Sequence, residues 1–213
     1  MAEATDMIAL EAPRKKTSAP ATPAVVPIEQ RTDVTVEELE KASLPYPAEL
    51  YNGKVVFKTA CPEHGIMQSN ITTDINFYLR QNRVGYVMTE TNFRLWPERS
   101  KESRIPDIAF VRKERLPEDL RHFPAIAPDL AIEIISPEDN FLEMMNKVDA
   151  YLEQGAKIVW VVISDTREVL VCTSQNKRSE KEVLRAPELL PGFELPVQKI
   201  FEGLPLPDKF PQA

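Results

Sequence analysis

Cysteine is scarce in this sequence, and its scarcity excludes two classes of protein. The 213 residues contain two cysteines, Cys61 and Cys172, which form no Cys-x-x-Cys pair. A disulfide framework and a cysteine zinc site both need several cysteines at short spacings, so we expect neither. We expect both thiols to be free and buried in a reducing compartment, and the protein to be cytoplasmic.

Long hydrophobic runs are also missing. None approaches the roughly 18 consecutive apolar residues of a membrane span, and the chain opens with no charged-then-apolar signal segment. We therefore expect neither secretion nor contact with a membrane. Residues 1–30 are rich in alanine, proline and threonine without an apolar period, which predicts a disordered tail. The acidic residues in this stretch are unusual for a transit peptide.

An excess of positive charge is the third absence. The net charge is −7, which argues against a protein that coats nucleic acid without regard to sequence. Residues 80–122 differ from the rest, with ten basic against seven acidic side chains. This stretch permits a polyanionic substrate, although an ordinary solvated surface has the same charge pattern.

Hydrophobic patterning predicts the fold class. A hydrophobic content of 43% supports a core, and we expect a single domain over residues 31–213. Asn52-Gly53 between two short extended runs predicts a β-hairpin. Residues 129–163 form a predicted strand–helix–strand unit, which favours a parallel, right-handed crossover. The prediction is an α/β fold with a mixed central β-sheet flanked by helices.

Two helices are expected to flank this sheet. An apolar stripe predicts the first over residues 63–82, with these residues facing the core: Ile66, Ile71, Ile75, Tyr78 and Leu79. The second is predicted over residues 138–155, with Pro137 near its start and Gly155 past its end. Its apolar stripe consists of Phe141, Met144, Met145, Val148, Tyr151 and Leu152.

One carboxylate stands where a core residue is expected. Glu133 lies within the otherwise apolar run of residues 130–135. An ionised carboxylate buried alone costs several kcal/mol, so it must be neutralised, paired or bound to a metal. Pairing with an arginine at a strand edge is the ordinary explanation for a single acid of this kind.

Asp107 offers Glu133 a different partner. It follows Pro106 and precedes the apolar run 108–111, and if this strand lies beside residues 130–135 the two carboxylates meet. Carboxylates this close repel each other unless a cation lies between them. Mg²⁺ suits the gap, and a metal held there can activate water and polarise a phosphoryl oxygen. Taken alone, Asp107 is also an ordinary turn residue.

Lys147 could supply a fixed positive charge. It lies at the edge of the apolar stripe of the second helix, one turn before Tyr151. From there its ammonium could reach the end of the Glu133 strand and stabilise negative charge or help to deprotonate water. A lysine that extends from a helix flank into solvent is the commoner arrangement.

Together these residues resemble the PD-(D/E)XK phosphodiesterase superfamily and, within it, the Uma family of restriction-endonuclease-like proteins. Four segments in order carry the resemblance, which spans about residues 48–201: IPDIAFV, APDLAIEIISPEDN, KVDAYLEQGAKIVWVV and LPGFELPV. The resemblance implies a restriction-endonuclease-like core and a metal-dependent DNA endonuclease that hydrolyses phosphodiester bonds. Relatives in the family tend to pair, and cutting both strands of DNA usually takes two active sites, so we expect a homodimer; the sequence leaves single- or double-strand cleavage open.

The resemblance also implies a ligand set. Asp107 and Glu133 correspond to metal ligands, the main-chain carbonyl of Ile134 to a third, and the metal is Mg²⁺ or Mn²⁺. The superfamily's usual lysine, two residues after the glutamate, is replaced here by Ile135. The resemblance assigns its role to Lys147.

A further acid and a competing interpretation remain. Glu49 matches an acidic position in the family's opening hairpin and is a possible additional residue near the metal. A catalytically inactive nuclease fold that binds DNA or protein is the alternative, because the overall acidity is poor for tight DNA binding and no appended DNA-reading motif is present. His64 is interpreted as a helix cap or surface residue, Asn140 as a cap, and Trp160 as core packing.

Overall fold

The centre of the protein is a six-stranded mixed sheet. The computed structural model describes residues 26–135 and 139–206. The sheet has the order β3 (Gly85–Thr89), β4 (Ile108–Arg112), β5 (Leu130–Ile135), β6 (Ile158–Ile163), β7 (Glu168–Cys172) and β8 (Lys177–Glu180). Only β5 and β6 run parallel among its neighbours. The α/β fold with a mixed sheet and the predicted parallel crossover are both confirmed.

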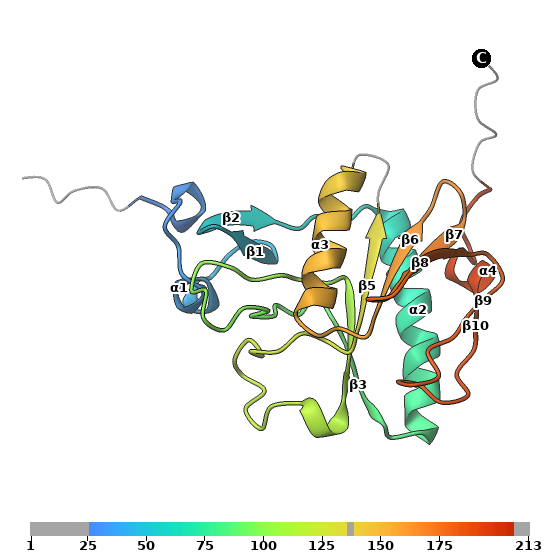
Figure 1. Cartoon of the computed structure of the whole chain (residues 1–213). Helices are drawn as coiled ribbons and strands as arrows, with labels where there is room; N and C mark the ends of the chain where they lie inside the picture. The colour runs from blue at the N-terminus through green and yellow to red at the C-terminus, as the bar shows by residue number, and fades with distance from the viewer. Residues whose placement is uncertain (1–25, 136–138, 207–213) are drawn as a thin grey trace, which may run out of the picture.

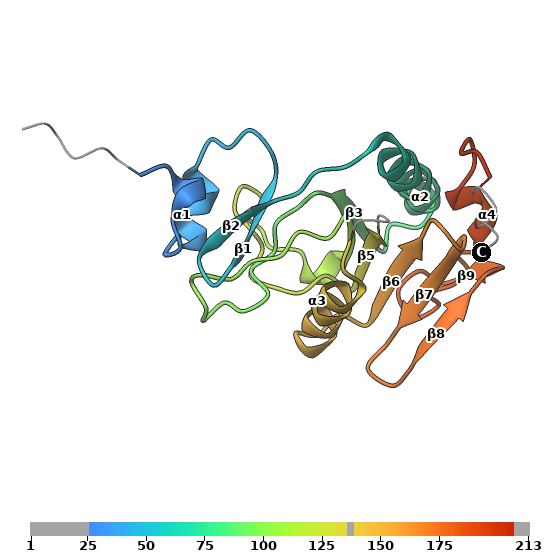
Figure 2. The same cartoon turned by 90° about the horizontal axis from the view of Figure 1, so that it is seen from above.

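Two helices cover opposite faces of this sheet (Figures 1 and 2). Helix α2 (Pro62–Gln81) packs on the face that includes Ile132 and Ile134, and α3 (Phe141–Glu153) packs on the face that includes Ala131 and Ile135. Successive side chains of a strand point to opposite faces. Glu133 therefore belongs to the α3 face, among residues that a purely structural sheet would make apolar.

Both predicted helices form, but their buried faces are shifted. On α2, the predicted core residue Ile66 is 38% exposed, and the helix buries Met67 instead. On α3, Phe141 is 52% exposed, and the buried face is made by Lys147, Val148 and Tyr151. Asn140 caps α3 as predicted, through hydrogen bonds from the amides of the first turn. Pro137 and the predicted helix start at residue 138 lie outside the described residues.

An N-terminal segment beside the sheet has a small core of its own. It contains a 3-10 helix (Ile28–Gln30), α1 (Val36–Lys41), β1 (Ala48–Tyr51) and β2 (Lys54–Phe57). Asn52 and Gly53, with φ of 49° and 80°, form the tight turn of the predicted hairpin. The 3-10 helix lies inside the predicted tail of residues 1–30, so ordered structure begins before that boundary; residues 1–25 are not among the described ones.

The remaining elements are short. A 3-10 helix (Lys113–Arg115) follows β4, and β9 (Val183–Leu184), β10 (Leu195–Pro196) and α4 (Val197–Ile200) form the C-terminal part, which packs against α2. Trp160 is fully buried in the core, as predicted. The prediction of two buried thiols is wrong for Cys61, which is exposed just before α2, while Cys172 is buried. Within the described ranges, no helix is both long and apolar enough to cross a membrane.

Candidate active site

Asp107 lies where β4 stops pairing with β5. The last residue pair between these strands is Ile108 with Ile132. Beyond it, the Asp107 carboxylate replaces a backbone acceptor, because its Oδ2 accepts a hydrogen bond of 2.6 Å from the amide of Ile134. The side chain is 2% exposed. The sequence therefore places this carboxylate beside the end of β5, as expected from adjacent strands.

Glu133 is held from the α3 side. Its Oε1 accepts a hydrogen bond of 2.9 Å from the Tyr151 hydroxyl and lies 3.0 Å from Lys147 Nζ. The side chain is 1% exposed. The partner of this buried carboxylate is thus a lysine, not the arginine of the ordinary explanation, and the predicted reach of Lys147 to the Glu133 strand is observed.

Lys147 connects two carboxylates and one carbonyl. Besides Glu133, its Nζ lies 3.3 Å from Glu49 Oε2 and donates a hydrogen bond of 2.9 Å to the Ile105 carbonyl. Glu49 Oε2 in turn accepts from the Ile105 amide at 2.7 Å. The hairpin β1–β2 therefore brings the further candidate Glu49 into the cluster, next to Lys147.

Two residues of the cluster were not predicted. Lys58, which follows β2, donates hydrogen bonds to Asp107 Oδ1 and to the Ile105 carbonyl, and its Nζ lies 3.7 Å from Glu133 Oε2. His64 Nε2 lies 3.1 Å from Asp107 Oδ2. His64 is 6% exposed, so its interpretation as a cap or surface residue is wrong. A signal was available, since His64 lies three residues before Met67 on the buried stripe of α2.

Burial and neighbouring charges pull the pKa values of this cluster in opposite directions. Desolvation opposes ionisation of Asp107, yet the hydrogen bond from His64 and the charge of Lys58 hold its pKa far below the ordinary range. For Glu133 desolvation prevails and raises the pKa, although both lysines oppose it. Burial disfavours the charged form of Lys147, but Glu133 and Glu49 keep its pKa above the usual value. Glu133 is therefore the carboxyl group that gains a proton most readily.

His64 gives the site a pH-dependent stability. Desolvation disfavours its charged form, but the hydrogen bond to Asp107 raises its pKa above the ordinary value of histidine. A raised pKa means that charged His64 stabilises the fold below the unfolded value, and that this contribution is lost as pH rises through the folded value. We expect His64→Gln to lower the free energy of unfolding more at about pH 5.5 than at about pH 9. Urea denaturation in EDTA measures this, and an equal loss at both pH values would contradict it.

The oxygen atoms of this cluster fit a hard metal ion. The described residues contain no group of three His, Cys, Asp or Glu side chains that could enclose a metal. Mg²⁺ needs fewer, since it binds through one or two carboxylates and keeps several waters. A third oxygen comes from the backbone: the amide of Ile134 points at Asp107, and its carbonyl faces the same side of the strand. If the register of β4 and β5 is continued by two residues, Pro106 lies opposite Ile134. Proline has no N–H to donate to the Ile134 carbonyl, which leaves this oxygen available to a metal.

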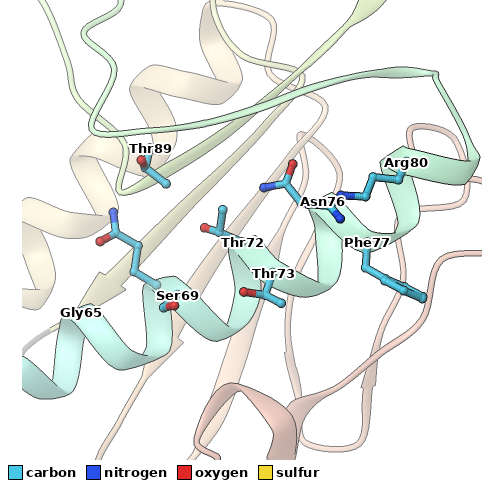
Figure 3. A pocket seen from close by; sticks show the side chains of 9 residues that line it. Gly65, Ser69, Thr72, Thr73, Asn76, Phe77, Arg80 and Thr89 are labelled. Atoms are coloured by element: carbon cyan, nitrogen blue, oxygen red, sulfur yellow. The ribbon is translucent and has the colours of Figure 1, made fainter.

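A shallow groove of about 380 Å³ begins beside the cluster and follows α2. Gln68 joins the two, because it lines the groove and its side chain donates to the Asp107 carbonyl and to Glu90. Figure 3 shows Thr72 and Asn76 on the side of α2 that faces the strand carrying Thr89. The remaining lining residues are Gly65, Ser69, Thr73, Phe77 and Arg80.

The mixed sheet, with two acids at adjoining strand ends and a lysine on the helix behind them, defines a restriction-endonuclease-like fold. The chain belongs to the family described as "Uma2: Putative restriction endonuclease", whose profile matches residues 36–198. The family resemblance of the sequence is thereby confirmed.

A solved structure agrees in fold. It is the crystal structure of "a putative nuclease belonging to DUF820" from Anabaena variabilis, with a TM-score of 0.66 and 24% sequence identity. The match covers 79% of this chain and 97% of that chain. No curated protein matches the sequence.

Proposed function

We propose that this protein is a metal-dependent endonuclease that hydrolyses phosphodiester bonds in DNA. The observation that supports the proposal is that Asp107 and Glu133, near the end of β5, both contact the ammonium of Lys58 and so flank a single position. Membership of a family of nuclease-like proteins supports the same reaction class. The homodimer and the cytoplasmic location stay predictions from the sequence.

Asp107, Glu133 and the carbonyl of Ile134 are the residues that would hold Mg²⁺ or Mn²⁺. When bound, such a metal lowers the pKa of its water and stabilises negative charge on the phosphoryl group. Lys147 orients Glu133, because its ammonium is already engaged by Glu133, Glu49 and the Ile105 carbonyl. Lys147 therefore acts on the metal site indirectly, by positioning the carboxylate of Glu133.

The test is cleavage of supercoiled plasmid and of single-stranded DNA by the full chain. We expect cleavage with Mg²⁺ or Mn²⁺ and none in EDTA, because the carboxylate pair alone cannot activate water at neutral pH. Glu133→Gln should lose this activity. Absence of cleavage with either metal and both DNA forms would contradict the proposal.

The groove along α2 is the surface we assign to the DNA backbone next to the site. Ser69, Thr73, Asn76 and Arg80 are exposed along this groove, and within the described residues their side chains make no hydrogen bond or ion pair, whereas the hydroxyl of Thr72 is buried. Hydroxyl, amide and guanidinium groups are the usual partners of phosphate oxygens. A strand that leaves the carboxylates past Gln68 would meet all of them.

Arg80→Ala is expected to weaken DNA binding several-fold and to reduce the steepness of its salt dependence by about one counterion. The matched control is Arg178→Ala on β8, at the opposite edge of the sheet from β3. Fluorescence anisotropy of labelled DNA in Ca²⁺, across a salt series, measures both. Equal effects of the two substitutions would remove the groove from the DNA-binding surface.

One observation favours the alternative of an inactive DNA- or protein-binding module. The three carboxylates Glu49, Asp107 and Glu133 already face two lysines and His64 within the protein. The cluster can therefore balance its charges without a metal ion. If cleavage is absent while DNA binding persists, this module is the function that remains.

A further inference from the structure

The position between the two proposed metal ligands is occupied by a side chain of the protein itself. Lys58 Nζ donates to Asp107 Oδ1 and to the Ile105 carbonyl, the latter at 3.0 Å, and lies 3.7 Å from Glu133 Oε2. Within the described residues, Lys58 is the cation that contacts both of these carboxylates. An ammonium group and a hard metal ion both bind carboxylate and carbonyl oxygen atoms, so the ammonium of Lys58 lies where the metal is expected.

A divalent ion and this ammonium cannot share the position. The Coulomb energy scales with the product of the two charges, so a divalent ion and an ammonium group repel each other about twice as strongly as two single charges at the same distance. The low exposure of Asp107 and Glu133 leaves little water to screen it. Binding of a metal to both carboxylates therefore requires the Lys58 ammonium to leave.

Of the two lysines in the cluster, Lys58 is the one that can leave. Its backbone is fixed just after β2, by a hydrogen bond of 2.8 Å from its amide to the Pro47 carbonyl, but its side chain is 19% exposed. A four-carbon stem from this position can carry the ammonium outward into solvent. Lys147 is 8% exposed, and its ammonium is held between Glu133 and Glu49.

We infer that Lys58 is an internal competitor for the divalent cation, which holds Asp107 and Glu133 in place until a metal displaces it. This inference rests on the proposed metal site and adds to it a control of metal affinity by the chain's own lysine. If Lys58 occupies the position for about nine-tenths of the time, the apparent metal affinity is about tenfold weaker than that of the free carboxylate pair.

The experiment is isothermal titration of the full chain with Mn²⁺, comparing wild type with Lys58→Met and Lys58→Gln. We expect both variants to bind Mn²⁺ about tenfold more tightly than wild type, because the competitor is removed. We also expect their melting temperatures in EDTA to fall, since Asp107 then loses a partner. Lys54→Met is the control, because Lys54 is an exposed lysine on the same hairpin, and it should leave Mn²⁺ affinity unchanged.

The salt dependence of Mn²⁺ affinity distinguishes direct competition by Lys58 from a long-range effect of its positive charge. The gain in affinity should persist between about 0.05 M and about 0.5 M KCl, because a direct competitor is not screened, whereas a long-range charge effect fades over this range. Wild-type affinity or weaker in both Lys58 variants would overturn the inference and leave the proposed function standing. So would a gain that disappears at high salt.

Two further outcomes of the Mn²⁺ titration bear on both the inference and the proposed function. Mn²⁺ binding by the Lys58 variants but not by wild type would support the inference and show that the native site is held closed against metal. This result would contradict metal-dependent cleavage by the native chain. No Mn²⁺ binding by any variant would overturn both the inference and the proposed metal site.

Discussion

Glu133→Gln is expected to abolish metal-dependent cleavage of DNA while the protein stays folded. The substitution keeps the shape of the side chain, and its amide oxygen can still accept the hydrogen bonds from the Tyr151 hydroxyl and Lys147. Lys147 also retains Glu49 as a charged partner. What the variant loses is one of the two negative charges that would hold the metal, so we expect the rate to fall at least about a hundredfold.

Asp107→Asn should have the same effect on cleavage for the same reason. Glu153→Gln is the matched control, because Glu153 is an exposed acid at the last residue of α3, six residues past Lys147. Initial rates of plasmid nicking at saturating Mg²⁺, together with melting temperatures, measure the result. Wild-type rates in either site variant would remove Asp107 and Glu133 from the metal site and leave them structural roles alone.

Lys147→Met is expected to destabilise the fold by about 3–5 kcal/mol, because it leaves Glu133 and Glu49 without their shared buried cation. This is a large share of the roughly 5–15 kcal/mol that stabilises an ordinary domain. Loss of cleavage in this variant would therefore say little about chemistry. Lys147 holds the site together, so catalytic roles are better tested at Glu133 and Asp107.

The control for this prediction is the double substitution of Lys147→Met with Glu133→Gln. Removing one buried charge leaves its partner buried without a counter-charge, whereas removing both leaves fewer unpaired groups. The double variant should thus be less destabilised than the sum of the two single variants. Urea denaturation in EDTA gives the three free energies. A loss below about 1 kcal/mol for Lys147→Met would mean that the pair contributes no more than an exposed ion pair does.

The proposed metal competition changes how the cleavage experiment is interpreted. A native chain whose carboxylates are held by Lys58 requires more metal for the same occupancy. Weak activity at low Mg²⁺ would then reflect the internal cation, not an inactive fold. A metal titration of the cleavage rate is accordingly more informative than a single concentration.

Local sequence patterns predicted those parts of the fold that depend on local interactions. The Asn52-Gly53 turn needs positive φ at both residues, which these two side chains tolerate, and the hairpin follows. The helix over residues 63–82 and the crossover over residues 129–163 are set by apolar periodicity. The faces of the helices were predicted less well, because Ile66 and Phe141 satisfy the helical period yet lie outside the packed interface.

The candidate site was predicted in part for a similar reason. Asp107 directly precedes β4 and Glu133 lies in β5, and because these two strands follow one another closely in the chain and pair directly, the proximity of the two acids could be inferred. His64 reaches the cluster from the buried stripe of α2. Lys58 reaches it because the hairpin crosses to the segment before β4, through the bridge between Leu50 and Ser103. No periodic pattern in the sequence specifies this contact.

The sequence by itself determined the fold class, the order of its elements and the pair of acids at adjoining strand ends, because periodicity, turn residues and a charge in an apolar run act over short distances. The tertiary structure alone decided that Lys58 also accompanies those acids. Lys58 and Asp107 are 49 residues apart, and their contact depends on the packing of the hairpin against the sheet. That packing places a lysine in the position where the family resemblance predicts a metal.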